Sequence, residues 1–134
     1  MAANILIVDD DPSIRGAIRE FLALSDYATF VAGNAEEAMA LLQSHPVDVI
    51  ITDIIMNGMN GLEMTQKIKE KYDTDIIVIT GYTGNYSYEE AISKGADDFV
   101  FKPIKLEELL LRLKRVLRER ELTQERTRML EQLK

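Results

Sequence analysis

Several short apolar runs in this chain end on residues that can handle a phosphoryl group and a metal ion. Three of these residues are carboxylates, one is a hydroxyl and one is an ammonium group. They are Asp9, Asp10, Asp53, Thr80 and Lys102. Gathered at one place, such groups can hold a divalent cation and neutralise phosphoryl oxygens. Their types and order therefore predict magnesium-assisted phosphoryl chemistry.

Each residue has a role that suits its chemistry. Asp53 is the candidate nucleophile, because a carboxylate can accept a phosphoryl group directly and become an acyl phosphate. Mg²⁺ prefers oxygen ligands and keeps waters beside one or two carboxylates, so Asp9 and Asp10 could serve it, one directly and one through water. Lys102 would pair with a second phosphoryl oxygen, and the Thr80 hydroxyl would bond a third. We predict that all five residues share one crevice.

The elements that must position these residues follow from hydrophobic periodicity. Five apolar runs of strand length alternate with segments of helical period, which predicts a parallel sheet with crossover helices. The polar ends of parallel strands meet at one edge of the sheet, where α/β folds bind ligands. Two of the runs are apolar throughout and require cover on both faces of the sheet. We expect a doubly wound, three-layer αβα sandwich with strands near residues 5–8, 27–31, 48–52, 75–80 and 99–101.

Residues that favour helix starts and helical periodicity lie between the predicted strands. Asp11 and Asn34 are suited to cap helices that begin directly after them. A third helix is expected over residues 61–71, after a glycine- and asparagine-rich loop, and a fourth passes through Ala91. From about Lys105 the chain should remain helical to its end, because neither glycine nor proline occurs after Pro103.

The last helix changes character along its length. Four leucines spaced by four, three and four residues form one apolar seam, and the same register then becomes polar at Arg120, Gln124 and Thr127. The seam is too short to predict a coiled coil. We therefore expect one domain over residues 1–117 and a helical extension, or a linker to a dimer partner or output module, over residues 118–134. The leucines are Leu106, Leu110, Leu113 and Leu117.

Composition narrows the class of protein. The 134 residues include no cysteine, and the sequence shows no apolar run of about 20 residues and no signal-peptide pattern at its start, so we expect a cytoplasmic protein without a membrane span. Residues 1–104 carry seventeen acidic and seven basic side chains, a net charge of −10. Such a surface repels nucleic acid phosphates, so we expect this segment not to bind DNA or RNA directly.

Five motifs occur over residues 4 to about 117, and their order and spacing together indicate a known family. They are Val8-Asp9-Asp10, Asp53 followed by Met56-Asn57-Gly58-Met59-Asn60-Gly61, Thr80-Gly81, Gly95-Ala96-Asp97-Asp98-Phe99, and Lys102-Pro103. In this respect the chain resembles the receiver domain of bacterial two-component response regulators, a family that includes the chemotaxis regulator. The resemblance implies a flavodoxin-like sheet with strand order 2-1-3-4-5, and a cis bond before Pro103.

The resemblance also implies a mechanism. Asp53 would take a phosphoryl group from a sensor histidine kinase or a phosphotransfer protein, in a reaction that needs Mg²⁺ or its substitute Mn²⁺. The metal ligands would be Asp10, Asp53 and the backbone carbonyl of Ile55, assisted by Asp9. Thr80 and Phe99 match the switch positions, which alter the surface of the fourth helix, last strand and last helix. That surface and the C-terminal helix would allow a homodimer.

Two further positions bear on the lifetime of the phosphoryl group. Ile55 and Tyr82 lie two residues beyond Asp53 and Thr80, where related receivers often carry polar groups that guide an attacking water. Both side chains are bulky here. We therefore expect slow self-dephosphorylation.

Two other functions compete with this interpretation. Asp9-Asp10-Asp11 after a strand also resembles the nucleophile motif of haloacid dehalogenase-like phosphatases, in which Asp9 would be phosphorylated and Asp11 would act as acid and base. Against that, the acidic pair Asp97-Asp98 precedes Lys102, the reverse of that family's order. A receiver-like scaffold regulated without phosphorylation is the third alternative. We expect an acceptor that phosphorylates and dephosphorylates itself, and not an enzyme of multiple turnover.

Overall fold

The computed structural model describes residues 2–81 and 88–133. Strands and helices alternate strictly along this part of the chain, as the hydrophobic pattern predicts. In order they are β1 (Asn4–Val8), α1 (Pro12–Leu24), β2 (Ala28–Ala32), α2 (Ala35–Leu42), β3 (Val49–Asp53), α3 (Gly61–Lys71), β4 (Asp75–Thr80), α4 (Tyr88–Ser93), β5 (Asp98–Phe101) and α5 (Leu106–Gln132).

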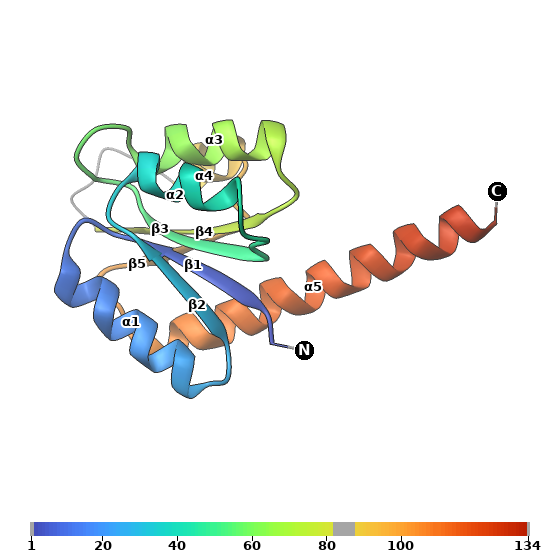
Figure 1. The fold of residues 1–134 in the computed structure, drawn as a ribbon, viewed down its shortest axis with the longest axis horizontal. Coiled ribbons are helices and arrows are strands. Elements are labelled where there is room, and N and C mark those ends of the chain that lie inside the picture. Colours follow the sequence, from blue (N-terminus) through green and yellow to red (C-terminus); the bar gives the residue numbers. More distant parts are fainter. Residues whose placement is uncertain (1, 82–87, 134) are drawn as a thin grey trace.

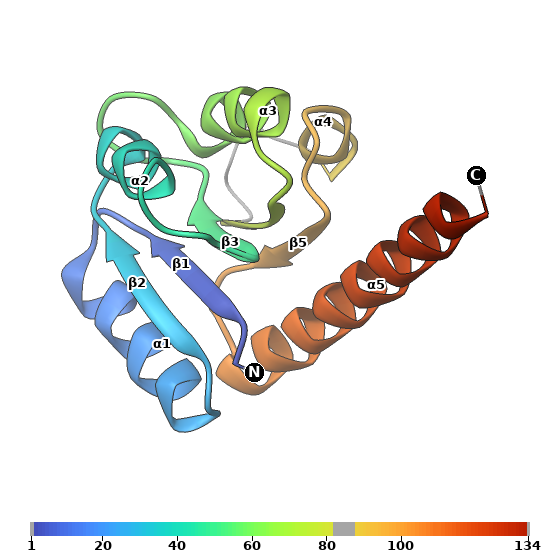
Figure 2. The ribbon, with the colours of Figure 1, turned by 45° about the vertical axis from the view of Figure 1, so that its right-hand side comes forward.

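The strands form one parallel sheet in the order β2-β1-β3-β4-β5. Helices α1 and α5 cover one face, and α2, α3 and α4 cover the other (Figure 1, Figure 2). This confirms the predicted doubly wound αβα sandwich. The strand order reverses between β1 and β3, and in open α/β sheets such a reversal leaves a crevice at the carboxyl ends of the two strands.

Alternation along the strands divides the core into two layers. In β1, Ile5 and Ile7 pack toward α1 and α5, while Leu6 and Val8 pack toward the helices of the opposite face. All four side chains are at most 1% exposed. A central parallel strand buried on both faces must be apolar at every position, which is why the run shows no polar alternation.

The helix starts confirm the sequence signals. The Asp11 carboxylate accepts from the Ser13 N–H at 2.9 Å, and the Asn34 side chain accepts from the Glu37 N–H at 2.9 Å. Asn60 caps α3 in the same way, accepting from the N–H groups of Leu62 and Glu63. These bonds satisfy donors that have no partner inside the helix, and so define where each helix begins.

Helix α5 packs on the sheet through its first half and then projects beyond the body of the domain (Figure 1). Its buried residues are Leu109, Leu113 and Val116, so the predicted leucine seam lies at the margin of the buried face and contributes only Leu113 to its centre. The helix crosses residue 117 without a break. The division at that residue therefore stays a prediction.

No helix within residues 2–81 and 88–133 combines the length and the apolar character that crossing a membrane requires.

Candidate functional site

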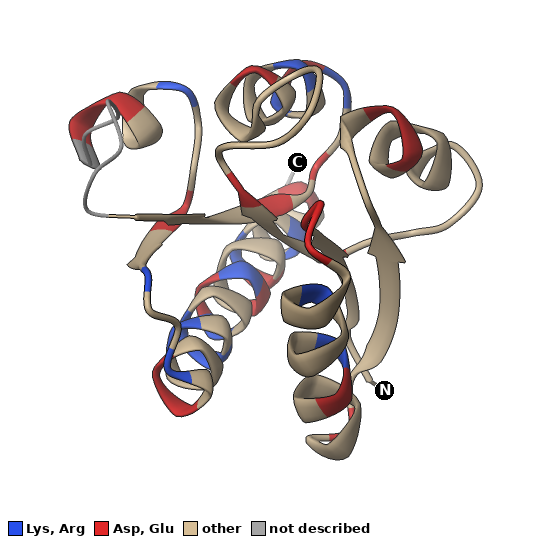
Figure 3. Cartoon of the chain, turned by 90° about the vertical axis from the view of Figure 1, so that its left-hand side faces the viewer, with Lys and Arg blue, Asp and Glu red and all other residues tan. Residues whose placement is uncertain are grey.

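Three carboxylates converge at the carboxyl ends of β1 and β3, where the strand order reverses. Asp9 and Asp10 follow β1, and Asp53 ends the neighbouring strand β3, whose register pairs Thr52 with Val8. One carboxylate oxygen from each of the three residues lies within 4.8 Å of the others. Figure 3 shows the acidic segments at the ends of these two strands lying side by side.

The cluster is partly removed from water. Asp9 is 2% exposed and Asp53 is 6% exposed, whereas Asp10 lies at the surface. Burial raises the pKa of the Asp9 carboxyl, and the nearby charges of Asp53 and Asp10 raise it further. A hydrogen bond from the Asp11 N–H and the charge of Lys102 oppose this shift without cancelling it. The carboxylates therefore repel one another, and this repulsion favours the binding of a cation.

The two carboxylate oxygens of Asp9 differ in their hydrogen bonding. The Asp11 N–H donates to Asp9 Oδ1 at 2.9 Å, which fixes the orientation of the carboxylate. Asp9 Oδ2 is buried and has no hydrogen-bond partner among the described residues. A buried, unsatisfied carboxylate oxygen is costly unless a cation or water completes it. The donor set consists of oxygens alone, which fits Mg²⁺ or Mn²⁺.

Lys102 joins the cluster from the loop after β5. Its Nζ lies 2.9 Å from Asp53 Oδ2, and its backbone N–H donates to the Thr80 carbonyl at 2.7 Å. Burial alone would lower the pKa of the Lys102 ammonium. The hydrogen bond to Asp53 and the charges of Asp53 and Asp9 outweigh burial and raise this pKa. The lysine thus stays charged beside the candidate nucleophile.

The family model for the response regulator receiver domain matches residues 5–114. The chain belongs to the receiver domain family of response regulators. The confirmed fold, with the predicted strand order, agrees with that membership.

Two curated bacterial regulators are similar to this receiver domain. The chain is 37% identical over 113 residues to the heme response regulator HssR of Staphylococcus saprophyticus, covering 84% of this chain and 50% of that protein. It is 36% identical over 123 residues to the transcriptional regulatory protein AruR of Pseudomonas aeruginosa, covering 88% of this chain and 50% of that protein. The chain thus spans about half the length of these curated relatives.

Solved structures show the same architecture. A CheY-like receiver domain protein from Methanospirillum hungatei superposes with a TM-score of 0.83 at 30% identity, covering 92% of this chain and 99% of that chain. NtrX from Brucella abortus gives a TM-score of 0.87 at 31% identity, covering 93% of this chain but 29% of that chain. The likeness therefore extends over nearly the whole receiver domain.

The proposed switch residues lie on the neighbouring strands β4 and β5. Thr80 ends β4, is 1% exposed, and its hydroxyl lies 3.5 Å from the Gly81 carbonyl. Phe99 is buried in β5, and its ring packs edge-on against that of Phe101, with 4.8 Å between the ring centroids. Phe101 is 44% exposed. This aromatic pair connects the core beside β4 to the surface. The switching roles of Thr80 and Phe99 stay predictions.

Of the two residues expected to affect the phosphoryl lifetime, the structure describes Ile55. Ile55 is 61% exposed, and its N–H donates a long bond of 3.4 Å to Asp53 Oδ1. Its side chain is therefore at the surface, two residues from the candidate nucleophile. Tyr82 lies outside the described residues.

Sequence reasoning did not identify Arg15. Its Nη1 donates to the Asp9 carbonyl at 3.0 Å, so a side chain from α1 supports the backbone that presents the acidic pair. An ideal Cβ at Gly33 would lie 3.0 Å from the same Nη1, so a side chain there would crowd the guanidinium. A lone arginine on a helix has no pattern that distinguishes it from a solvated charge. Only the structure, in which the first turn of α1 lies beside the end of β1, reveals the contact.

Replacing Asp9 with asparagine should stabilise the receiver domain in the absence of metal. The substitution removes a buried charge that Asp53 and Asp10 repel, so we expect the free energy of unfolding to rise by about 1–3 kcal/mol. Urea denaturation measures this change. Mg²⁺ should stabilise the wild type by preferential binding to the folded state, and should stabilise Asp9→Asn much less.

Asp11→Asn is the matched control. It makes the same chemical change two residues away, at an exposed helix cap where asparagine serves equally well. We expect it to change the free energy of unfolding by less than about 0.5 kcal/mol. Destabilisation by Asp9→Asn, or equal effects of the two variants, would contradict the view that mutual repulsion of these carboxylates destabilises the metal-free site.

Proposed function

We propose that this receiver domain is a phosphorylation-dependent switch in which Asp53 accepts a phosphoryl group from a histidine kinase or a phosphotransfer protein. A carboxylate oxygen of Asp53 forms the new P–O bond while the P–N bond of the donor phosphohistidine breaks, and the electron pair of that bond returns to the imidazole nitrogen. The observation that carries this proposal is the 2.9 Å contact between Lys102 and Asp53 inside the acidic cluster. It pairs a buried nucleophile with a cation suited to phosphoryl oxygens.

The carboxylates supply the metal site that such a transfer needs. We assign Asp10, Asp53 and the Ile55 backbone carbonyl as ligands of Mg²⁺, with Asp9 assisting. Bound there, Mg²⁺ would neutralise charge on the phosphoryl oxygens. The unpartnered Asp9 oxygen supports this assignment, and so does the raised pKa of the Asp9 carboxyl, because burial and the neighbouring carboxylates disfavour its charged form and a bound cation would favour it.

Phosphorylation would redistribute the contacts around Asp53. Lys102 would exchange its bond with Asp53 Oδ2 for one with a phosphoryl oxygen, and the Thr80 hydroxyl would turn toward another. Thr80 and Lys102 are already linked through the backbone at 2.7 Å. Movement of Thr80 and Phe99 would then change the surface of α4, β5 and α5, which controls dimerisation or output.

Two observations favour an acceptor over a phosphatase-like enzyme. Asp11, which would act as acid and base in the phosphatase, is exposed and occupied as the cap of α1. Asp53, which the phosphatase does not use as nucleophile, is the carboxylate paired with the lysine. We therefore propose a single transfer to Asp53 followed by slow hydrolysis, in the cytoplasm where a kinase domain has access to ATP.

Phosphoryl uptake tests the proposal directly. Intact-protein mass after incubation with acetyl phosphate and Mg²⁺ reports the adduct, and substitution of Asp53 must remove it. Steady turnover of a phosphate ester without a stable adduct would favour the enzyme instead.

Replacing Ile55 with asparagine should shorten the lifetime of the phosphorylated state. A polar side chain at this exposed position could guide an attacking water, so we expect hydrolysis to accelerate at least about threefold, which corresponds to about 0.7 kcal/mol. Loss of the adduct is followed by mass after removal of the phosphoryl donor. Ile55→Leu, which keeps the apolar bulk, should leave the rate unchanged, and equal lifetimes in both variants would contradict this role. Tyr82→Glu is the companion variant suggested by the sequence.

A further inference from the structure

Arg120 joins the second half of α5 to the body of the domain. Arg120 is 11% exposed in its side chain, although it lies in the polar second half of the helix. Residues 121–133 are all exposed. Among the described residues of α5, Arg120 is thus the last one that is not classed as exposed.

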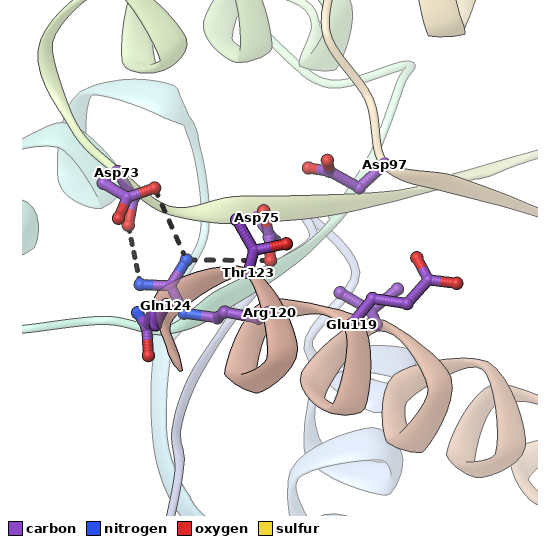
Figure 4. A pocket seen from close by; sticks show the side chains of 8 residues that line it. Asp73, Asp75, Asp97, Glu119, Arg120, Thr123 and Gln124 are labelled. Atoms are coloured by element: carbon purple, nitrogen blue, oxygen red, sulfur yellow. Dashed lines mark hydrogen bonds and ion pairs between the residues drawn. The ribbon is translucent and has the colours of Figure 1, made fainter. Parts of the chain in front are cut away.

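Its guanidinium contacts three carboxylates at the amino end of the sheet, opposite the site of Asp53. The distances are 3.7 Å from Nε to Asp48, 3.7 Å from Nη1 to Asp73 and 3.6 Å from Nη1 to Asp75. Nη2 also donates to the Asp73 carbonyl at 2.8 Å. Figure 4 shows Arg120 reaching from α5 toward Asp73 and Asp75. The three residues line a hollow of about 190 Å³. One side chain therefore joins α5 to the entries of β3 and β4.

Arg120 is a shared counterion of these carboxylates. Burial raises the pKa of the Asp75 carboxyl, and the charge of Asp97 raises it further, while Lys69 and Arg120 lower it. Lys69 pairs with Asp97 at 2.7 Å and with Asp75 at 3.6 Å, so its charge is already shared. Removal of Arg120 would leave Asp48, Asp73 and Asp75 close together without their common cation. The side chain of Asp75 is 20% exposed and that of Asp48 is 38% exposed, whereas that of Asp73 is 90% exposed, so the loss falls mainly on Asp75 and Asp48. Leaving a partly buried carboxylate without its partner is destabilising.

The polar part of the helix has little else to keep it in place. Within α5, Arg115 pairs with Glu119 at 3.3 Å, but both side chains are mostly exposed and belong to the same helix. Such a pair contributes little to stability. Without tertiary contacts, a helical segment of this length is marginal in water. Packing of Leu109, Leu113 and Val116 on the sheet sets the axis of the helix, and among the described residues Arg120 makes the last ion pairs between α5 and the body of the domain. The direction of residues 121–132 therefore depends on Arg120 as well as on that packing.

We propose that Arg120 is a latch: its contacts with Asp48, Asp73 and Asp75 fix the direction in which α5 leaves the domain and make residues 121–132 a rigid extension of it. The same cluster reaches the start of β5, because Asp97 accepts from the Ile76 N–H at 2.8 Å and pairs with Lys69. A rearrangement of β4 and β5 would therefore be transmitted to the helix. That transmission rests on the proposed phosphorylation switch, whereas the latch itself does not.

The test measures the helix direction in the unphosphorylated protein. The chain has no cysteine, so Lys67→Cys on α3 and Glu131→Cys near the end of α5 allow specific attachment of two spin labels. Pulsed electron resonance then gives the distribution of distances between them, in an excess of unlabelled protein so that only intramolecular pairs contribute. We expect a single narrow distribution in the otherwise unchanged chain. Arg120→Gln should at least double its width.

Arg115→Gln is the matched control, because it makes the same change on the same helix but removes only an exposed pair. It should leave the width unchanged. A narrow distribution in Arg120→Gln, or equal broadening in both variants, overturns the proposal.

Cooperative unfolding in urea shows whether Arg120→Gln retains a folded body. If it does not, Arg120→Lys decides the question. Lysine keeps the charge, but a single ammonium cannot reproduce the planar fork that reaches several carboxylates at once. The distribution should then broaden relative to wild type, and an unchanged width overturns the latch.

The latch and the proposed function fail separately. Asp53→Asn should abolish phosphoryl uptake and leave the unphosphorylated distribution as narrow as in wild type. Failure of the latch would appear as an unchanged width in the Arg120 variants, with phosphoryl uptake at Asp53 intact.

Discussion

Replacing Asp53 with asparagine should abolish phosphoryl uptake from acetyl phosphate, whereas the wild-type chain should gain one Mg²⁺-dependent adduct. Asparagine keeps the shape of the side chain but lacks the anionic oxygen that attacks phosphorus. It also removes the partner of Lys102, so neither the nucleophile nor its ion pair remains. Intact-protein mass with and without Mg²⁺ measures the result, and Asp11→Asn should retain the adduct.

The contrary outcomes point to different functions. An adduct that survives Asp53→Asn but disappears in Asp9→Ala would favour the phosphatase-like enzyme with Asp9 as nucleophile. Absence of an adduct in the wild type would favour a scaffold that works without phosphorylation. An adduct that forms equally well without Mg²⁺ would contradict the assigned metal site.

Replacing Gly61 with alanine should lower the free energy of unfolding by about 3 kcal/mol or more. An ideal Cβ at Gly61 would overlap the carbonyl oxygen of Asp53 and lie 3.0 Å from the Asp53 carbonyl carbon and Ile54 Cα. These are backbone atoms, which cannot move aside as a side chain could. The Gly61 N–H also donates to the Ile54 carbonyl at 2.7 Å, so the start of α3 is held against the end of β3. Urea denaturation measures the loss.

Gly16→Ala provides the control. Gly16 lies inside α1, and nothing lies within 4 Å of a Cβ built there. Alanine in a helix interior should therefore stabilise the protein by about 0.5–1 kcal/mol. Equal stability of Gly61→Ala and wild type would show that the close approach is dispensable. Because the clash displaces Asp53, Gly61→Ala should also slow phosphoryl uptake under conditions where the variant remains folded.

The sequence predicts the elements well wherever periodicity and caps agree. The expected ranges of α3 and β4 match the structure, and the caps at Asp11 and Asn34 are confirmed. The start of α5 was expected at about Lys105 and lies at Leu106. Its buried face was less well predicted, because several leucine registers are apolar and only the surface of the sheet selects Leu109, Leu113 and Val116.

For the site, strand ends were sufficient to predict which residues meet. Parallel strands bring Asp9, Asp53 and Lys102 to one edge whatever the details of packing. Their order in the chain cannot show that Asp9 is buried with one oxygen unpartnered, or that Lys102 contacts Asp53 directly. Those properties depend on side-chain packing between segments far apart in sequence.

Arg120 and Gly61 illustrate the same division. In the sequence, Arg120 is one charge in a polar helix and Gly61 is one of several loop glycines. Only the folded chain places the arginine among three carboxylates from distant parts of the sequence, and the glycine against the backbone of Asp53. The sequence by itself determined the order of elements and the chemistry at the strand ends, since both follow from local periodicity and residue type. Distances, burial and charge pairing were decided by the tertiary structure, because they arise from contacts between residues that the chain order leaves far apart.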